Sequence, residues 1–464
     1  MEIDGRKALV LGAGKSGIAS AKFLAERGAV VALHDKKPVD EWTEIARSLK
    51  KTNNVGLLSG QIPSWLLDQI DLVVISPGVP TNTIPARYVD RKDGEVIGEV
   101  ELAYRFMKGR IVGVTGSNGK TTTTTLIGEL LKNAEIKTQV GGNIGTPLLS
   151  LAESSTDEAW TVAELSSYQL ETIKDFHASV AICLNVTPNH LDRYESFTDY
   201  AAAKHRIFMN QKHDDVAILN ADDEITASWA SGLKAHTVMF STRTELDEGL
   251  FLRGNELVCR ANGKERALTT RDRIAIRGLH NVENVLASLA AGLACGASPE
   301  SMADAVAKFK GVEHRLEVVS EIQGVTFYND SKATSVDATL KALEALSDGE
   351  GKIVLILGGR GKNAPYGPLV ELIERNVRIL IVLGEDGDNI ELQLKEHADI
   401  VRVSSIREAV NAAFKVSEPG DSVLLAPACA SFDMFKSFEE RGEVFKAAVE
   451  DLKREKSIQS VTVS

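Results

Sequence analysis

Residues 113–122 read GVTGSNGKTT and follow the apolar run Ile111–Val112. An apolar strand, a glycine-rich turn ending in Lys-Thr and a helical run predict a loop that binds a nucleoside triphosphate, because backbone N–H groups of such a loop wrap phosphates. Lys120 would neutralise the β- and γ-phosphates, and the Thr121 hydroxyl would hold Mg²⁺. Val114 stands where the general pattern has its first glycine, so the match is to the shorter G-x-x-G-K-T form.

A second glycine turn, LGAGKSG, lies at residues 11–17. Gly12, Gly14 and Gly17 fit the pattern G-x-G-x-x-G after a strand and before a helix, and Asp35 ends the next strand. This spacing predicts a site for a diphosphate and a ribose. It leaves open whether the ligand carries a nicotinamide, or whether the glycines serve only strand–helix packing.

The composition is that of a globular protein of two to three domains, since 464 residues exceed one ordinary core. The net charge of −12 and the absence of a long basic run argue against nucleic acid as a partner. The cysteines are widely spaced and form no CxxC pair, which favours reduced thiols over zinc or disulfides: Cys183, Cys259, Cys295 and Cys429. No signal peptide or membrane span is visible, so we expect a cytoplasmic protein.

Strand and helix patterns alternate along the whole chain, which predicts an α/β fold with three domains in series. Boundaries are expected near residues 109 and 312. Residues 240–276 differ, because turn signals at Arg253–Asn255 and Asn262–Gly263 predict short hairpins. The expected strands are Ala8–Leu11, Val30–Leu33, Asp71–Ser76, Ile111–Val114, Thr161–Leu165, Val180–Leu184, Val216–Leu219, Lys352–Leu357, Val377–Leu383 and Ser422–Ala426.

Three further polar residues lie close to strand ends in the middle of the chain. Glu164 ends a strand in AELSS, His190 follows the next strand in NVTPNHLDRY, and Lys204 lies on a helix in YAAAKHRIF. Each alone fits an ordinary solvated strand end, loop histidine or helix-surface lysine. An open parallel sheet presents its ligand-binding groups at the carboxyl ends of its strands, so together they are candidates for metal binding and charge neutralisation beside the glycine-rich loop.

Ten motifs spread over the chain together resemble the Mur ligase family, and most closely its members that add D-glutamate to UDP-N-acetylmuramoyl-L-alanine. In order they are GSNGKTT, GGNIGTP (141–147), AELSSYQLE (163–171), NVTPNHLDRY (185–194), AAAKHRIF (201–208), GLHNVENVLA (278–287), EHRLE (313–317), YNDSKATS (328–335), LGGRGKN (357–363) and PACASFDMFKSFEERG (427–442). The order and number of these motifs are far more specific than either glycine turn alone.

The resemblance implies a Rossmann-like N-terminal domain (1–109) that holds UDP rather than NAD. It also implies a central P-loop ATPase-like α/β domain (110–312) that binds ATP, and a C-terminal Rossmann-like α/β domain (313–464) that carries the amino acid. The implied enzyme is an ADP-forming ligase of cytoplasmic peptidoglycan precursor synthesis that acts as a monomer, without nucleic acid or membrane. ATP would phosphorylate a carboxylate, and the amine of D-glutamate would attack the acyl phosphate through a tetrahedral intermediate.

The resemblance also implies roles for individual residues. Lys120, Glu164, His190 and Lys204 would be catalytic, with two Mg²⁺ ions bound by Thr121, Glu164, His190 and Lys204 as a carbamate on its ε-nitrogen. ATP would contact Gly116, Ser117, Asn118, Gly119, Lys120, Thr121, Thr122, Asn284 at the adenine, Arg315, Asp330 at the ribose, and Lys332. The sugar nucleotide would contact Ser16, Asp35, Lys36, Gly78, Asn143 and Ser166, and D-glutamate would contact Thr334, Lys362, Ser431 and Phe438.

Four alternatives remain open on the sequence. A Mur ligase for a diamino acid is expected to carry Asp-Asn-Pro-Arg in its last domain, which this chain lacks, and one adding alanine is a further option. A folylpolyglutamate synthase lacks a UDP domain, so residues 1–100 count against it. A nicotinamide-dependent dehydrogenase with an accessory ATPase domain and a non-enzymatic nucleotide switch are the others. Phosphate release that requires both UDP-N-acetylmuramoyl-L-alanine and D-glutamate would separate them.

Overall fold

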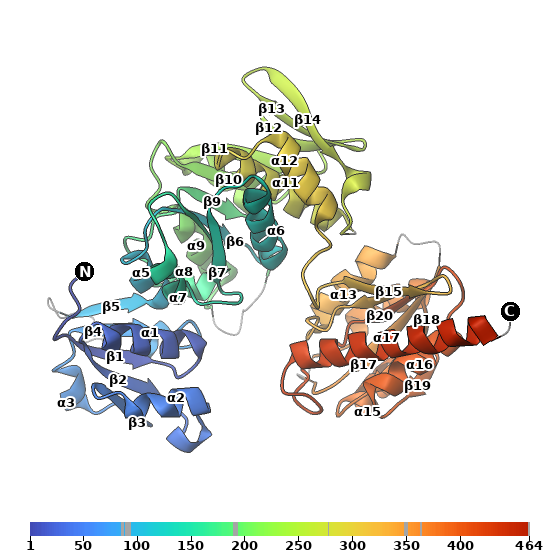
Figure 1. Cartoon of the computed structure of the whole chain (residues 1–464), viewed down its shortest axis with the longest axis horizontal. Coiled ribbons are helices and arrows are strands. Elements are labelled where there is room, and N and C mark those ends of the chain that lie inside the picture. Colours follow the sequence, from blue (N-terminus) through green and yellow to red (C-terminus); the bar gives the residue numbers. More distant parts are fainter. Residues whose placement is uncertain are drawn as a thin grey trace. The chain divides into compact units, whose positions relative to one another are not determined.

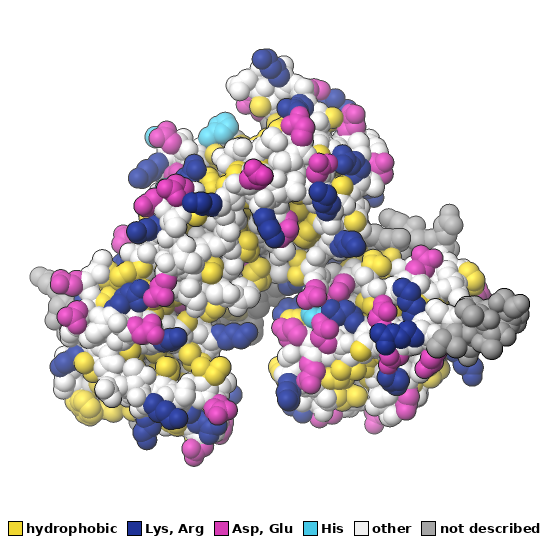
Figure 2. All heavy atoms as spheres, in the orientation of Figure 1, with side chains coloured by type: hydrophobic (Ala, Val, Ile, Leu, Met, Phe, Trp, Pro, Cys, Tyr) yellow, Lys and Arg dark blue, Asp and Glu magenta, His cyan; other side chains and the backbone are white. Residues whose placement is uncertain are grey.

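The computed structural model (Figure 1) describes residues 1–84, 88, 94–188, 194–276, 278–347, 351–361 and 364–462. The chain forms two compact units, one of residues 1–274 with 280–307 and one of residues 275–279 with 308–464. The first unit contains two β-sheets and the second contains one. On the face shown in Figure 2, acidic and basic side chains are interspersed over both units. Within the described ranges, no helix has the length and apolarity needed to cross a bilayer.

The first sheet is parallel and has the strand order β3-β2-β1-β4-β5. Its central strands are short apolar runs that are mostly buried on both faces, as expected for a parallel sheet covered by helices, and its edge strands are less buried. They are β1 (Lys7–Leu11), β2 (Val30–Asp35), β3 (Val55–Ser59), β4 (Leu72–Ile75) and β5 (Glu95–Gly98). The accompanying helices are α1 (Lys15–Glu26), α2 (Glu44–Ser48), α3 (Ser64–Leu67) and α5 (Glu99–Tyr104).

The second sheet has the order β14-β13-β12-β11-β10-β9-β6-β8-β7 in the described part of the chain. Strands β6 (Arg110–Thr115), β7 (Thr138–Gly142), β8 (Trp160–Glu164), β9 (Val180–Cys183), β10 (Val216–Asn220) and β11 (His236–Ser241) pair in parallel. Strands β12 (Gly249–Arg253), β13 (Glu256–Ala261) and β14 (Lys264–Thr270) form antiparallel hairpins at the edge, which confirms the hairpins expected in this segment.

Most helices of this part connect successive strands of the sheet. They are α6 (Lys120–Asn133), α7 (Leu148–Leu151), α8 (Ser167–Leu170), α9 (Phe197–His205), α10 (Glu224–Trp229), α11 (Leu279–Ala294) and α12 (Pro299–Lys308). Helix α7 contacts both α1 and α5 of the first sheet's layer, so the two sheets of this unit share a hydrophobic core.

The third sheet has the order β15-β16-β20-β17-β18-β19. Its strands are β15 (Glu317–Ile322), β16 (Val325–Asn329), β17 (Ile353–Gly358), β18 (Val377–Leu383), β19 (Ile400–Arg402) and β20 (Ser422–Leu425). Successive side chains of β17 enter opposite cores, with Leu355 on one face and Ile356 on the other, as strand geometry requires. The helices are α13 (Val336–Leu346), α14 (Val370–Asn376), α15 (Gly387–Leu394), α16 (Ile406–Val416) and α17 (Phe438–Thr462).

Candidate functional site

The glycine-rich loop joins β6 to α6 in the middle of the second sheet. Gly119 is the N-cap of α6 with a φ of 83°, and a Cβ there would come within 2.2 Å of the Asn284 side-chain oxygen. Only glycine fits this left-handed, crowded position. The loop is tied to the chain after β9, because the backbone N–H of Asn118 donates to Asn185 Oδ1 at 2.8 Å and the Ser117 hydroxyl donates to the Thr187 carbonyl at 3.0 Å.

Two lysines meet at one carbonyl oxygen of this loop. Lys120 Nζ donates to the Gly116 carbonyl at 2.9 Å, and Lys204 Nζ, from α9, donates to the same oxygen at 2.8 Å. Lys204 is only 1% exposed, and its ammonium lies 4.6 Å from the centre of the Tyr200 ring. Burial, together with the charge of Lys120, lowers the pKa of Lys204 to about 7. This burial excludes the alternative interpretation of Lys204 as an ordinary helix-surface lysine.

Glu164, at the carboxyl end of β8, is 2% exposed. Its Oε1 accepts a hydrogen bond from Asn143 Nδ2 at 2.9 Å, whereas its Oε2 is buried without a hydrogen-bond partner among the described residues. A carboxylate oxygen that is buried and unpaired is costly unless a cation binds it. The hydroxyl of Thr121, at the start of α6, supplies the oxygen ligand that Mg²⁺ commonly takes from such a loop, so these residues fit a magnesium site.

The other residues predicted for this part of the site have mixed outcomes. His190 lies outside the described residues. Asn284 lies behind the glycine-rich loop, where its side-chain oxygen accepts from the Thr123 hydroxyl at 3.3 Å and its amide donates to Asn281 at 3.0 Å. Ser166 caps α8 through a capping box with Gln169. The adenine contact and the sugar contact predicted for Asn284 and Ser166 stay predictions.

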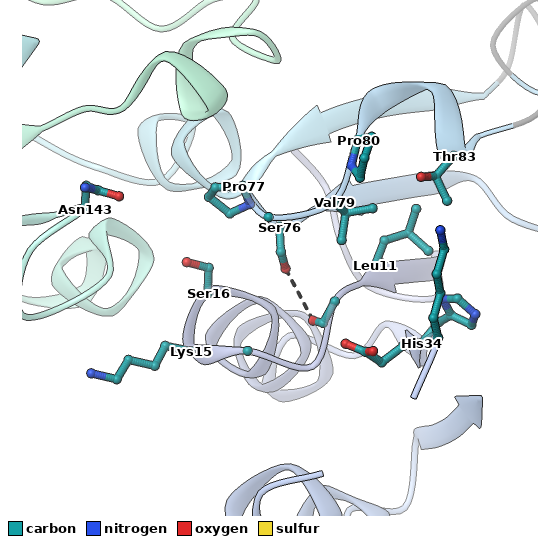
Figure 3. A pocket seen from close by; sticks show the side chains of 15 residues that line it. Leu11, Lys15, Ser16, His34, Ser76, Pro77, Val79, Pro80, Thr83 and Asn143 are labelled. Atoms are coloured by element: carbon teal, nitrogen blue, oxygen red, sulfur yellow. Dashed lines mark hydrogen bonds between the residues drawn. The ribbon is translucent and has the colours of Figure 1, made fainter. Parts of the chain in front are cut away.

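A pocket of about 550 Å³ opens over the carboxyl ends of β1, β2 and β4 (Figure 3). It lies at the second glycine turn, where a Cβ on Gly17 would come within 1.8 Å of the Gly12 carbonyl oxygen. Asn143, from the loop after β7, also lines it, so one side chain contacts both this pocket and Glu164. The pocket includes five of the six residues predicted for the sugar nucleotide, namely Ser16, Asp35, Lys36, Gly78 and Asn143.

Asp35 supports the glycine turn from the end of β2. Its Oδ2 accepts a hydrogen bond from the Ala13 N–H at 2.9 Å, and its Oδ1 accepts one from the Lys37 N–H at 3.1 Å. Burial raises the pKa of this carboxyl, but these N–H groups and the nearby His34 and Lys37 outweigh that effect and lower it below the ordinary value. Asp35 therefore stays ionised, and its hydrogen bond to Ala13 stabilises the glycine turn that lines the pocket.

Four of the residues predicted for the second unit lie in loops after β16 and β20, which meet the loop after β17 at the carboxyl ends of these strands. The Ala428 N–H donates to the Ala333 carbonyl at 2.9 Å, and Arg360 and Ala430 exchange two backbone hydrogen bonds of 2.9 and 3.0 Å. These three loops, at residues 330–334, 358–361 and 427–431, are called the binding loops below. They contain Asp330, Lys332, Thr334 and Ser431.

Arg441, on α17, joins all three binding loops and was not among the residues predicted from the sequence. The side chain is 2% exposed and donates to the Ser331 hydroxyl and carbonyl at 3.0 and 2.9 Å, to the Cys429 carbonyl at 3.2 Å and to the Gly358 carbonyl at 3.4 Å. Burial lowers the pKa of this guanidinium to about 10. Its signal in the sequence was an arginine inside the motif SFEERG, which a surface position would have explained equally well.

The remaining predicted residues of this unit lie close to the binding loops. Lys332 Nζ lies 3.9 Å from the centre of the Phe438 ring, the first residue of α17. Arg315 lies between His314 and Leu316, whose φ angles of 62° and 45° are left-handed, an uncommon conformation outside glycine. Burial raises the pKa of Asp330 to about 7, although Arg315 opposes the shift. Lys362 lies outside the described residues.

Comparisons with known proteins match all three parts of the chain. The Mur ligase MurD-like N-terminal domain matches residues 6–98, the Mur ligase middle domain residues 114–292, and the Mur ligase glutamate ligase domain residues 314–429. A UDP-N-acetylmuramoylalanine–D-glutamate ligase of Solibacter usitatus is 47% identical, over 97% of this chain and 99% of its own. The protein of the same name from Koribacter versatilis is 45% identical, over 97% and 98%.

Solved structures share the fold at lower identity. A MurF ligase of Thermotoga maritima in complex with ADP aligns with a TM-score of 0.59 and 19% identity, over 97% of this chain and 96% of that one. The UDP-N-acetylmuramate–alanine ligase MurC of the same organism aligns with a TM-score of 0.58 and 20% identity, over 97% and 100%. The three-domain α/β fold expected from the sequence is thereby confirmed.

Proposed function

This chain belongs to the Mur ligase family, and we propose that it joins D-glutamate to UDP-N-acetylmuramoyl-L-alanine with the cleavage of ATP to ADP and phosphate. The observation that carries this proposal is the 41–47% identity to curated D-glutamate ligases over nearly the whole chain. The chain is an enzyme, an amide-forming ligase of peptidoglycan synthesis, and its family depends on ATP and Mg²⁺. The roles of individual residues below are proposals.

The chemistry begins with a poor acyl donor. A carboxylate cannot expel oxide, so one of its oxygens attacks the γ-phosphorus of ATP, the bond to ADP breaks, and an acyl phosphate forms. The amine of D-glutamate then adds to the acyl carbon, the tetrahedral intermediate expels phosphate, and the nitrogen loses a proton to leave the amide. Lys120 would offset the repulsion between the carboxylate and the triphosphate, because opposite charges in a buried site attract strongly.

Thr121, Glu164 and a carbamate on Lys204 are the residues proposed to hold Mg²⁺, with His190 as a ligand outside the described residues. The ion would supply charge stabilisation to the phosphoryl group. The Oε2 of Glu164, which has no hydrogen-bond partner among the residues that the structure describes, supports its role as a ligand. The burial of Lys204 next to Lys120 supports the carbamate, because reaction of the neutral amine with carbon dioxide releases one proton and replaces a repelled cation by an anion.

The pocket at the first sheet is proposed to bind the UDP part of the sugar nucleotide. Its volume of about 550 Å³ and its glycine turn suit a diphosphate, and Asn143 would link it to the metal site. Asn284, Arg315, Asp330 and Lys332 are proposed for ATP. Thr334, Lys362, Ser431 and Phe438 are proposed for D-glutamate. A cytoplasmic location and a monomeric state stay predictions, which cell fractionation and sedimentation would check.

A substrate screen read by phosphate release tests the function. Release is expected only when ATP, UDP-N-acetylmuramoyl-L-alanine and D-glutamate are all present. With ¹⁸O in the acceptor carboxylate, one labelled oxygen is expected in the liberated phosphate. Unlabelled phosphate would exclude the acyl phosphate, and release in the absence of D-glutamate would exclude the proposed amine acceptor.

A further inference from the structure

A hydrogen-bonded pair, the buried Tyr366 and the half-buried Asp386, lies next to the binding loops of the third sheet. Tyr366 is 2% exposed, and its hydroxyl donates to Asp386 Oδ2 at 2.5 Å. The same hydroxyl lies 3.1 Å from the sulfur of Cys429, which is fully buried. Neither Tyr366 nor Asp386 belongs to the set of residues assigned to a substrate above.

Asp386 supports the binding loop 358–361 directly. Its backbone N–H donates to the Gly359 carbonyl at 2.9 Å, and a Cβ on Gly361 would come within 2.4 Å of its carboxylate. The loop therefore lies in contact with the carboxylate, and only glycine can approach it so closely. The side-chain amide of Asn389, on α15, donates from Nδ2 to Asp386 Oδ2 at 3.3 Å, the same oxygen that accepts from Tyr366.

The opposite end of the pair contacts the binding loop 427–431. Cys429 follows Ala428, whose φ of 58° is left-handed and requires support from its surroundings. Cys429 also precedes Ala430, which exchanges backbone hydrogen bonds with Arg360. The side chains of Tyr366, Asp386 and Cys429 thus contact both loops close to the backbone hydrogen bonds that join them. Cys429 lies two residues before Ser431.

We infer that Tyr366 and Asp386 are positioning residues for the amino-acid substrate, which set the relative placement of the loops at 358–361 and 427–431. This inference rests on the proposed function, because it takes D-glutamate to bind at Ser431. A dicarboxylate is recognised by several donors at once, so a shift of either loop weakens its binding. Without the Tyr366 hydroxyl, the Asp386 carboxylate loses a charge-assisted hydrogen bond at a partly buried position.

The test is steady-state phosphate release by the full-length Tyr366→Phe and Asp386→Ala variants, with each of the three substrates varied in turn. The KM for D-glutamate is expected to rise about tenfold, which corresponds to the loss of one such hydrogen bond. The KM for ATP and the KM for the sugar nucleotide are expected to stay within about twofold of wild type, a small change on the same free-energy scale. Asp386→Asn, which keeps one oxygen for the tyrosine, is expected to raise the KM for D-glutamate less than Asp386→Ala does.

Asp421→Asn is the matched control. Asp421 is another hydrogen-bonded carboxylate of this unit, 2% exposed, but it lies at the amino end of β20, where it accepts from the Lys352 N–H at 2.8 Å and from Arg378 Nε at 2.7 Å. The Asp421→Asn variant is expected to have a lower melting temperature than wild type, without a selective change in the KM for D-glutamate. An unchanged KM for D-glutamate in folded Tyr366→Phe, or a parallel rise of all three KM values, would overturn the inference. If phosphate release by the wild-type enzyme did not depend on D-glutamate, the proposed function would be overturned, and the inference with it.

Discussion

Lys120 and Lys204 donate hydrogen bonds to the same acceptor, the Gly116 carbonyl oxygen, at 2.9 and 2.8 Å. The two residues are far apart in the sequence, and their ammonium groups repel each other in a buried place. Burial, and next to it the charge of Lys120, lowers the pKa of Lys204 and so favours the neutral amine over the cation.

The variant Lys204→Ala tests the proposed carbamate on Lys204. We expect kcat to fall at least about 100-fold, because a charged group close to the transferred phosphoryl is lost. Lys204→Arg should lower kcat by a similar factor, since a guanidinium cannot form the carbamate. A short carboxylate added with Lys204→Ala should restore part of the activity. Lys212, an exposed lysine of the same unit, gives the control Lys212→Ala. Normal turnover by Lys204→Ala would contradict the carbamate.

Glu164→Gln tests the metal site. The amide retains an oxygen for Asn143 but removes the charge from the buried, unpaired oxygen, so the concentration of Mg²⁺ needed for half-maximal activity should rise about 10- to 100-fold. The measurement is phosphate release against Mg²⁺ at saturating ATP. Glu158→Gln, an exposed glutamate paired with Lys137 at 3.5 Å, should leave this dependence unchanged. An unaltered Mg²⁺ dependence in Glu164→Gln would exclude Glu164 as a ligand.

Glu99→Gln should change how stability depends on pH. Burial raises the pKa of Glu99 to about 7, although the Leu149 N–H, at 2.7 Å, opposes the shift. Because the folded-state pKa exceeds the unfolded one, this group costs nothing below the unfolded pKa and its full penalty appears as pH rises through 7. Glu99→Gln should therefore be more stable than wild type at alkaline pH, by roughly 3 kcal/mol at most, and lose that advantage in acid.

Thermal unfolding of both proteins across pH measures this difference. Glu101→Gln is the control, because Glu101 is equally buried but accepts from the backbone N–H groups of Lys174 and Phe176 and from Arg105. It should destabilise the protein at neutral pH rather than stabilise it. A constant difference between Glu99→Gln and wild type over the whole pH range would show that Glu99 does not titrate as described.

Arg441→Lys should loosen the three binding loops together. A lysine cannot reproduce the planar set of donors that joins Ser331, Gly358 and Cys429, and buried acceptors left unpaired cost about 1–3 kcal/mol each. The KM for ATP and the KM for D-glutamate should therefore rise together, in contrast to Tyr366→Phe. Arg407→Lys, at an exposed arginine paired with Asp451, should change neither value. Selective loss of D-glutamate binding alone would contradict this role.

The strand–turn–helix segments could be predicted from the sequence because the residues that determine them are adjacent in the chain. The strand–turn–helix around Gly116 and the glycine turn at Gly12 follow from the backbone freedom of glycine and the short apolar runs before them. The strands β3, β5, β7, β11, β15, β16 and β19 were not expected, because their runs are short or mixed in polarity and their pairing comes from neighbours distant in the sequence.

Sequence alone determined the order of the domains, the two nucleotide-type loops and the residue types available for the chemistry, since each depends on spacing along the chain. Only the tertiary structure decided that Lys204 is buried against the Gly116 carbonyl, that one oxygen of Glu164 has no partner within the described residues, and that Arg441 joins three loops. Burial and hydrogen-bond partners come from segments that meet only when the sheets form, and they set the charge and position of each group.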